Sequence, residues 1–330
     1  MIKQKLNLVD DVYYSRDYVS LFLKNKDEVF DFEYNSGDKF FLNKTIKRPI
    51  EKIGNINVED GYFDLETAYG YGGFYTNSDD TKFIEKALDE YRVKCLEENI
   101  IAEFMRFHPF NNFPINFNKY LDFNLNDREI VVVRLENDIL SSYTSKVRNT
   151  IKRAAEKVTF KESDNYNEFL RLYEITMKKN KADDFYFFDE FFFKKLMALD
   201  SVKLYEVIYD NKIISMGFFM FGSDLVHYHL SANTEEAYRL NSNYTLLNNL
   251  FGLAKQMNKK YVILGGGTTS MEDDPLLKFK KKFSKNTMPF YISGKIYNKE
   301  VYNKYNALWL KQSDKDMNYF LKYRLEVINE

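Results

Sequence analysis

The sequence predicts a mixed α/β protein with two lobes, and two observations carry that prediction. The first is an antiparallel meander of three apolar runs, separated by the polar turns Asp210–Lys212 and Gly222–Asp224. The second is the long amphipathic helix and the short buried strand that follow the meander. The three runs, the helix and the strand are Val202–Tyr209, Ile213–Phe221, Leu225–Ser231, Asn243–Met257 and Tyr261–Leu264.

The first lobe is predicted from shorter signals. A turn at Asn35–Gly37 separates two runs that form a hairpin, and Asn77–Asp80 is a polar start for an amphipathic helix that reaches Cys95. The predicted elements of this lobe are a helix around Ser15–Lys24, the helix after Asp80, and strands at Val29–Tyr34, Asp38–Ile46, Tyr62–Glu66, Ile100–Phe107 and Glu129–Leu135.

A basic segment begins the second lobe. Ser145–Ala154 is predicted as a helix in which Lys146, Asn149 and Arg153 share one face. Between residues 141 and 160 five basic residues stand against one acid. We therefore place the boundary near residue 140 and expect domains at 1–140 and 141–330. The other elements expected in the second domain are helices at Ser163–Lys179, Asp189–Leu199 and Pro275–Phe283, a strand at Pro289–Ile296 and two final helical segments.

Composition excludes several classes of protein. Lys and Arg total 48 and Asp and Glu total 49, a net charge of −1, which disfavours a protein that wraps nucleic acid. The single cysteine, Cys95, allows no intramolecular disulfide and no cysteine-rich metal site. No apolar run approaches the length of a membrane span, and the N-terminus shows no signal-peptide pattern, so we expect a cytoplasmic protein.

The stretch with the strongest chemical signal follows the last buried strand. Tyr261–Leu264 ends in three glycines, and Leu276–Phe283 carries four lysines and no acid. Glycines let the backbone leave a strand in conformations that other residues avoid, and they admit a close neighbour. Lysines directly after such a turn predict a site for an anionic ligand.

Several motifs resemble one branch of the GNAT acyltransferases, the branch of the Fem-type aminoacyltransferases that build peptidoglycan cross-bridges. Any one of these motifs is weak, but six of them in order make the resemblance fairly specific. The motifs are Asp64–Gly73, similar to "D-x-x-x-x-Y-G-Y-G-G", Glu103–Pro109, similar to "E-F-x-R-F-H-P", the basic helix Lys146–Ala154, and the shorter matches Tyr228–Ser231, Leu264–Gly267 and Phe279–Phe283.

This resemblance implies two tandem GNAT-like domains that hold an acceptor between them. It also implies an enzyme that transfers an acyl or aminoacyl group to an amine of a cell-wall or sugar-nucleotide precursor. No tightly bound cofactor is expected, and the donor is aminoacyl-tRNA or acyl-CoA. The glycine-containing pyrophosphate loop of CoA users would fall near Arg239–Tyr244, which has no glycine. An acetyl-CoA-dependent N-acetyltransferase of polysaccharide biosynthesis and a non-catalytic binding protein remain as alternatives.

Lys280 is the first choice for a catalytic group, because a fixed ammonium stabilises phosphates or the oxyanion of acyl transfer. The competing interpretation is that all four lysines only keep a surface soluble. Gly265 and Gly266 are expected to admit substrate beside Lys280, and Phe279 to line the same site. In the basic helix, Lys146, Arg148 and Arg153 suit phosphate or carboxylate ligands, unless they only pair with acids.

The first lobe offers a second set of binding candidates. The loop Tyr69, Gly70, Tyr71, Gly72 and Gly73 is expected to line the acceptor site, although a short glycine loop alone is weak evidence. Arg106 and His108 alternate on the strand that follows and face one side together. A hydrogen-bonded structural histidine is the competing interpretation of His108.

His227, His229 and Ser231 are expected on one face of a strand, with His229 as a candidate general base and Ser231 as a substrate contact. Cross-strand polar packing and substrate-assisted proton transfer are the alternatives. No metal site is expected, because the chain has only three histidines and one cysteine. Neither substrate nor oligomeric state follows from the sequence.

Overall fold

The computed structural model describes residues 6–136, 138–180 and 187–327. Its chain forms two compact units, each with its own core. Unit 1 consists of Leu6, Asp10–Val12 and the described residues of Arg128–Pro289. Unit 2 consists of Asn7–Val9, Tyr13–Asp127 and the described residues of Phe290–Glu330. Each unit is therefore built from separate stretches of chain, whereas the domains expected at 1–140 and 141–330 are continuous and remain a prediction.

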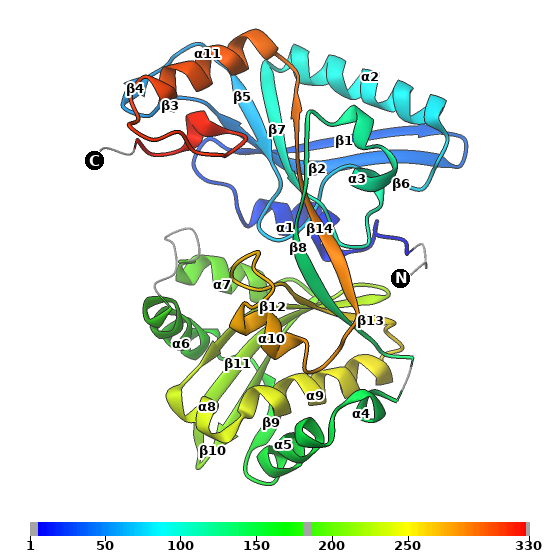
Figure 1. Ribbon diagram of the computed structural model, residues 1–330, viewed down its shortest axis with the longest axis vertical. Helices are drawn as coiled ribbons and strands as arrows, with labels where there is room; N and C mark the ends of the chain where they lie inside the picture. Colours follow the sequence, from blue (N-terminus) through cyan, green and yellow to red (C-terminus); the bar gives the residue numbers. More distant parts are fainter. Residues whose placement is uncertain (1–5, 137, 181–186, 328–330) are drawn as a thin grey trace. The chain divides into compact units, whose positions relative to one another are not determined.

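Unit 1 contains a mixed sheet with the strand order β8-β13-β12-β11-β10-β9 (Figure 1). The predicted meander is confirmed, because β10, β11 and β12 pair antiparallel. β13 then pairs parallel to β12 and antiparallel to β8. These strands are β8 (Phe123–Arg134), β9 (Thr159–Ser163), β10 (Val202–Tyr209), β11 (Lys212–Phe221), β12 (Leu225–Asn233) and β13 (Tyr261–Gly265).

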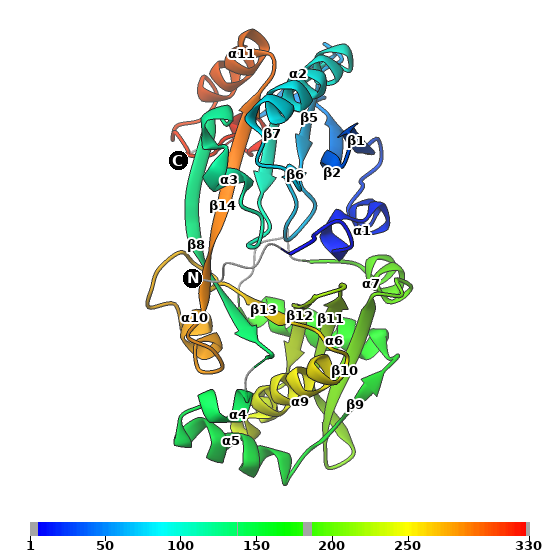
Figure 2. The same ribbon diagram turned by 90° about the vertical axis from the view of Figure 1, so that its right-hand side faces the viewer.

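Helices cover both faces of this sheet (Figures 1 and 2). Phe218 and Phe219 alternate along β11, so their rings lie on opposite faces. Phe218 meets Phe169 of α6 and Phe193 of α7, whereas Phe219 belongs to the core cluster that includes Leu246 of α9. The helices of the unit are α4 (Ile139–Ser142), α5 (Ser145–Ala155), α6 (Tyr166–Lys179), α7 (Glu190–Met197), α8 (Glu235–Leu240), α9 (Ser242–Gln256) and α10 (Pro275–Lys280).

Unit 2 repeats the same scheme. An antiparallel series β1-β2-β5 is followed by a helix, by β7 parallel to β5, and by β14 antiparallel to β7. The bounds are β1 (Glu28–Ser36), β2 (Lys39–Pro49), β5 (Phe63–Glu66), α2 (Thr81–Glu97), β7 (Ile100–Arg106) and β14 (Thr287–Ile296). The prediction of a mixed α/β fold is confirmed, and the shared strand order fits an internal duplication.

The alternation of β7 separates two hydrophobic clusters in unit 2. Met105 points to the cluster of α2, while Ala102 and Phe104 belong to the cluster of α11 (Lys299–Leu310), which includes the fully buried Trp309. Figure 1 shows α2 and α11 flanking the sheet of this unit. Residues of α11 thus complete a core that also contains Ile50 and Ile53, far earlier in the chain.

The remaining described elements are short. They are α1 (Arg16–Ser20), α3 (Phe113–Asn116), the two-residue strands β3 (Lys52–Ile53), β4 (Ile56–Asn57) and β6 (Tyr75–Thr76), and 3-10 turns at Val12–Tyr14, Asn118–Tyr120 and Lys322–Arg324. Among the described helices, none has an apolar stretch that would span a bilayer.

Candidate functional site

The loop that follows β13 brings together the glycines and the lysine predicted from the sequence. Gly265 ends the strand with a φ of +81°, a left-handed conformation that glycine adopts without strain. The chain then turns back through residues 266–274 to α10, which begins with Asp274 as N-cap and Pro275 in its first turn. Lys280 is the last residue of this short helix.

Lys280 is a buried lysine, with only 7% of its surface exposed. Its Nζ donates a hydrogen bond of 2.7 Å to the carbonyl of Gly266. Burial lowers the pKa of Lys280 to about 7, with the nearby Arg128 adding to this effect and Asp274 opposing it. At neutral pH the amine is therefore present both as ammonium and as free base.

The carboxylate of Asp274 holds the start of the same loop. Oδ2 accepts from the backbone N–H and the hydroxyl of both Thr268 and Thr269, at 2.6 to 3.2 Å. Oδ1 accepts from the backbone of Leu277 at 2.9 Å, the N-cap bond of α10. Burial alone would raise the pKa of Asp274, but these hydrogen bonds more than offset burial and hold it well below its usual value.

Close approach explains two of the three glycines. A Cβ on Gly267 would lie 2.5 Å from the carboxylate of Asp274, and one on Gly266 would lie 3.0 Å from the carbonyl of Glu129. A side chain at either position would displace the loop from the groups that hold it. The predicted role of Gly265 and Gly266, to admit a substrate beside Lys280, remains a prediction.

The other lysines of α10 and of the residues after it have different surroundings. Lys281 pairs with Glu129 at 2.6 Å, Lys282 reaches the hydroxyl of Tyr244 at 3.1 Å, and Lys278 is exposed. Phe279 packs edge-on against Tyr244 and Phe283, so much of its ring contributes to the core of unit 1.

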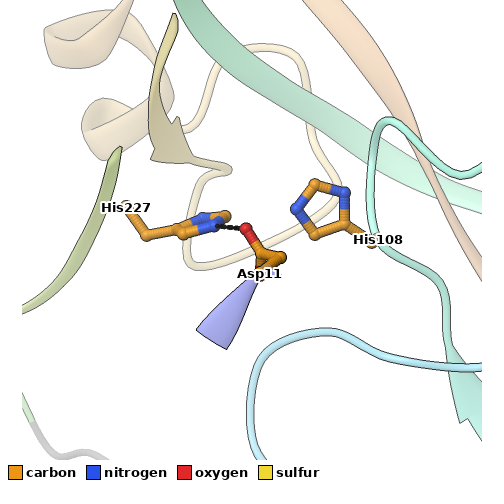
Figure 3. A group of neighbouring side chains, drawn as sticks. All are labelled: Asp11, His108 and His227. Carbon is orange, nitrogen blue, oxygen red and sulfur yellow. Dashed lines mark hydrogen bonds and ion pairs between the residues drawn. The ribbon is translucent and has the colours of Figure 1, made fainter. Parts of the chain in front are cut away.

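The histidines of β12 lie in a buried polar environment. His227 Nε2 and Asp11 Oδ2 are 2.8 Å apart, with both side chains only 2% exposed (Figure 3). Burial lowers the pKa of His229 to about 3, with a further contribution from His227. A ring with so low a pKa is a weak proton acceptor, which weighs against His229 as the general base.

A β-bulge changes the expected geometry of this strand. Leu230 opposes Phe218 and Tyr228 opposes Phe219, so His229 is an extra residue in the ladder. The shared face predicted for His227, His229 and Ser231 assumed simple alternation, which the bulge interrupts. Ser231, which follows the bulge, is half-buried.

The basic helix α5 presents its charges to solvent. Val147, Ile151 and Ala154 are buried, and Lys146 and Arg153 are exposed. Within the described residues, neither Lys146 nor Arg153 forms an ion pair. Arg148 instead donates to the carbonyls of Leu140 and Tyr143 and to the hydroxyl of Ser145, so part of its donor capacity ties down the turn before the helix.

The glycine loop of unit 2 is tightly packed. Gly70 has a φ of +97°, and a Cβ there would lie 2.3 Å from the ring of Tyr13. Gly73 has a φ of +82°, with the ring of Phe107 2.8 Å from its Cβ position. The hydroxyls of Tyr18 and Tyr14 donate to the carbonyls of Tyr69 and Gly72. The loop is thus held as a fixed turn, and a substrate contact by Tyr69, Tyr71 or the glycines remains a prediction.

Arg106 and His108 both have partners within unit 2. Arg106 donates to Glu66 at 2.6 Å and to the carbonyl of Thr67, and it lies over the ring of Phe104. The Nδ1 atom of the buried His108 accepts from the backbone of Phe110 at 3.1 Å. These contacts favour structural roles for both residues. For His108 this is the competing interpretation, a hydrogen-bonded structural histidine.

A hollow of about 470 Å³ lies elsewhere in unit 1. Its lining includes Glu162, Asp164, Asp200 and Lys203 and contains none of the predicted site residues. The hollow is acidic, whereas the expected ligands are anionic, so we assign it no part in the candidate site.

The sequence missed two residues of the Lys280 site. Asp274 was part of a predicted polar turn and was given no role of its own. Arg128 donates to the carbonyls of Gly267 and Thr268 but lies about 140 residues away in the chain. The Asp-Pro pair at 274–275 is a helix-start signal that could have identified Asp274 as a cap. No local signal connects Arg128 to this loop.

Comparison with known proteins shows what the fold is similar to. The structure resembles FemX with a TM-score of 0.67 and 12% identity, over 90% of this chain and 94% of that chain. It also resembles L-PGS from Bacillus licheniformis (TM-score 0.52, 13% identity, 80% and 83% covered) and the C-terminal domain of a putative lysylphosphatidylglycerol synthetase from Agrobacterium fabrum (0.51, 13%, 83% and 85%).

No protein-family model matches the chain, and no curated protein matches it by sequence. At 12 to 13% identity these structural likenesses concern the fold. The fold expected from the motifs, that of the Fem-type branch, is therefore confirmed by the likeness to FemX.

Proposed function

We propose that the chain is an acyltransferase that moves an acyl or aminoacyl group onto an amine, with Lys280 as its catalytic group. The observation that carries the proposal is a buried lysine amine, without an ion pair among the described residues, that contacts the glycine turn after β13 in a fold similar to that of FemX. Structural lysines are normally exposed or paired, and a buried lysine with a pKa near neutrality is typical of a functional group.

Either protonation state of Lys280 suits one step of the transfer reaction. The acceptor nitrogen attacks the carbonyl carbon of the donor, a C–N bond forms, and the carbonyl oxygen becomes an oxyanion. The intermediate then collapses with loss of the donor alcohol or thiol, and the nitrogen releases a proton. An ammonium stabilises the oxyanion, and a free amine accepts the proton, so a group with a pKa of about 7 suits either role.

The acceptor we propose is an anionic, amine-bearing cell-wall or sugar-nucleotide precursor. The basic surface of α5 supports this choice, because Lys146 and Arg153 are exposed and pair with no described acid. Phosphate and pyrophosphate groups are the ligands that such a surface binds best. Arg148 would take part only with donors left over from its bonds to Leu140 and Tyr143.

Two donors compete, and one observation favours each. The likeness to FemX and to the lysylphosphatidylglycerol synthetase domain supports an aminoacyl donor, since the synthetase by its name handles a lysyl group. The start of α9 supports acyl-CoA, because Asn241 there has a φ of +57° and so provides the left-handed turn that the missing glycine would otherwise supply. The N-terminal N–H groups of a 15-residue helix are suited to a pyrophosphate.

Mass spectrometry tests this function directly. A panel of muropeptides and amino-sugar nucleotides is incubated with the protein and either acetyl-CoA or charged tRNA. We expect one acceptor to gain the mass of one acyl or aminoacyl group, which identifies donor and acceptor together. If an acceptor is bound, as shown by calorimetry, and yet gains no mass with either donor, the non-catalytic binding protein is the better account.

A further inference from the structure

In the loop between β13 and α10, three charged side chains form hydrogen bonds with the backbone at residues 266–269. Lys280 holds the carbonyl of Gly266, and Arg128 holds the carbonyls of Gly267 and Thr268 at 3.2 and 3.4 Å. Asp274 holds the N–H groups of Thr268 and Thr269. The loop is therefore fixed from both sides, by cations on its carbonyls and by an anion on its amides.

Asp274 is the common support of this arrangement. Only 3% of its surface is exposed, its carboxylate accepts five hydrogen bonds, and it caps the helix that carries Lys280 in its last turn. The same carboxylate holds the start of α10, which carries Lys280, and the loop that follows Gly266. It therefore helps to fix the distance between Lys280 Nζ and the carbonyl of Gly266. Only the bond to Leu277 is needed to cap the helix. The other four bonds hold Thr268 and Thr269 of the loop, so Asp274 does more than cap α10.

We propose that Asp274 is a positioning residue that holds the amine of Lys280 in place. The carboxylate does this through the loop contacts and through its negative charge, and it does not itself contact substrate. The catalytic meaning rests on the proposed function, whereas the effect on Lys280 can be measured without any substrate.

Few charged groups act on Lys280 in the described structure. Asp274 at the start of α10 raises its pKa and Arg128 of β8 lowers it. The neighbouring acid Glu129 pairs with Lys281, and Lys282 meets Tyr244. Asp274 is thus the acid whose removal has a defined effect: the ammonium form of Lys280 loses its stabilising charge, and its titration moves to lower pH.

The experiment follows the titration of Lys280 by NMR in full-length protein with ¹³Cε-labelled lysine. The Lys280→Gln variant assigns the resonance. Asp274→Asn keeps the shape and loses the charge, and Asp274→Ser keeps a good N-cap and loses the loop contacts. Asp189→Asn is the matched control, because Asp189 also caps a helix through its side chain, at Phe192 of α7.

We expect the wild-type Lys280 resonance to titrate near neutral pH and to move to lower pH in both Asp274 variants. The Asp189→Asn variant should titrate as wild type, although it loses a comparable cap charge. An unchanged or higher midpoint in Asp274→Asn overturns the proposal. So does loss of cooperative unfolding in both Asp274 variants, which would make the carboxylate a requirement of folding only.

The result separates this inference from the proposed function. A shifted Lys280 titration in a protein that transfers no group in the mass-spectrometric panel supports the positioning role and contradicts the enzyme. With an active donor and acceptor pair, the limb of the pH–rate profile that Lys280 sets should move to lower pH with the NMR midpoint in Asp274→Asn and stay in place in Asp189→Asn. That limb is the alkaline one if the ammonium stabilises the oxyanion, and the acid one if the free amine accepts the proton.

Discussion

At the scale of single residues, burial brings the pKa of two very different groups to about 7. Lys280 of unit 1 is a base whose pKa burial lowers, and Glu103 of unit 2 is an acid whose pKa burial raises. Three donors counteract the rise in Glu103: the hydroxyls of Tyr297 and Tyr91, at 2.7 and 2.9 Å, and the amide of Asn43 at 2.6 Å. Without them the pKa of Glu103 would lie higher still.

The raised pKa of Glu103 makes stability depend on pH. The folded protein keeps a proton on Glu103 up to about pH 7, whereas the unfolded chain releases it near pH 4.5, so this group's contribution to the free energy of unfolding falls as pH rises between those values. The loss is on the order of 3 kcal/mol. We expect Glu103→Gln to remove that slope, measured by urea unfolding from pH 4.5 to 7.5.

Tyr297→Phe is the companion variant. It removes one donor to the carboxylate, so the pKa of Glu103 should rise further and the falling slope should extend above pH 7. Glu98→Gln is the control, because it removes a partly exposed carboxylate that pairs with Lys47. This variant should keep the wild-type slope. A wild-type slope in Glu103→Gln itself would contradict the assignment.

Residue type and spacing made Lys280 a candidate but could not predict which residues surround it. A lysine after a glycine-ended strand is visible in the sequence, and so is its family motif. The burial that sets its pKa depends on Arg128 and on the loop, which come close only in the folded chain. The pairing of Asp11 with His227, 216 residues apart, was hidden for the same reason.

At the scale of elements, Gly70 and Gly252 should respond in opposite ways to replacement by alanine. Gly70 has a left-handed backbone with the ring of Tyr13 against it, while Gly252 lies in the middle of α9 with nothing near its Cβ position. Gly252→Ala should stabilise the protein by about 0.5–1 kcal/mol, because alanine is the better helix former. Gly70→Ala should destabilise it by about 2 kcal/mol or more, through strain and overpacking.

Thermal and urea unfolding measure both changes. Gly37→Ala separates the two causes, because Gly37 also has a positive φ, of +62°, but nothing within 4 Å of its Cβ position. It should therefore cost only the backbone strain, about 1 kcal/mol. If Gly70→Ala cost no more than Gly37→Ala, the packing of Tyr13 against the loop would have no energetic weight.

Long periodic elements were predictable and short polar ones were not. The meander, α2, α5, α9 and the β1–β2 hairpin lie within a few residues of their predicted bounds. The sequence signals missed β9, a mostly exposed edge strand of five residues, and α8, a six-residue helix. Ser163, expected to start a helix, ends β9, because Asn165 is the cap of α6. The bulge at His229 has no sequence signature in this chain.

At the scale of the whole molecule, the end of the chain completes unit 2. Arg324 donates to both oxygens of the buried Asp64, at 2.7 and 2.9 Å, and to the carbonyls of Pro49 and Arg48. Burial alone would raise the pKa of Asp64, but Arg324 and Arg48 outweigh burial and keep it lowered. A prediction of domains along the chain could not show this return, because it depends on contacts 260 residues apart.

Arg324→Ala should therefore destabilise unit 2 strongly. Among the described residues, Asp64 would keep only Arg48 as a cationic partner, and a buried charge with an incomplete shell costs about 3 kcal/mol. Arg239→Ala is the control, because Arg239 is 77% exposed and its pair with Glu236 should be worth no more than about 0.5 kcal/mol. Equal unfolding midpoints for the two variants would contradict an anchoring role for Arg324.

The central claim is that the amine of Lys280 takes part in acyl transfer, and a comparison of two lysines on one helix tests it most directly. The measurement is the single-turnover rate of transfer, with the donor and acceptor that mass spectrometry identifies, for Lys280→Ala and Lys278→Ala. Lys278 lies in the same turn of α10 but is exposed. We predict a loss of about 100-fold or more for Lys280→Ala and a nearly unchanged rate for Lys278→Ala. Transfer by Lys280→Ala at the wild-type rate would contradict the account.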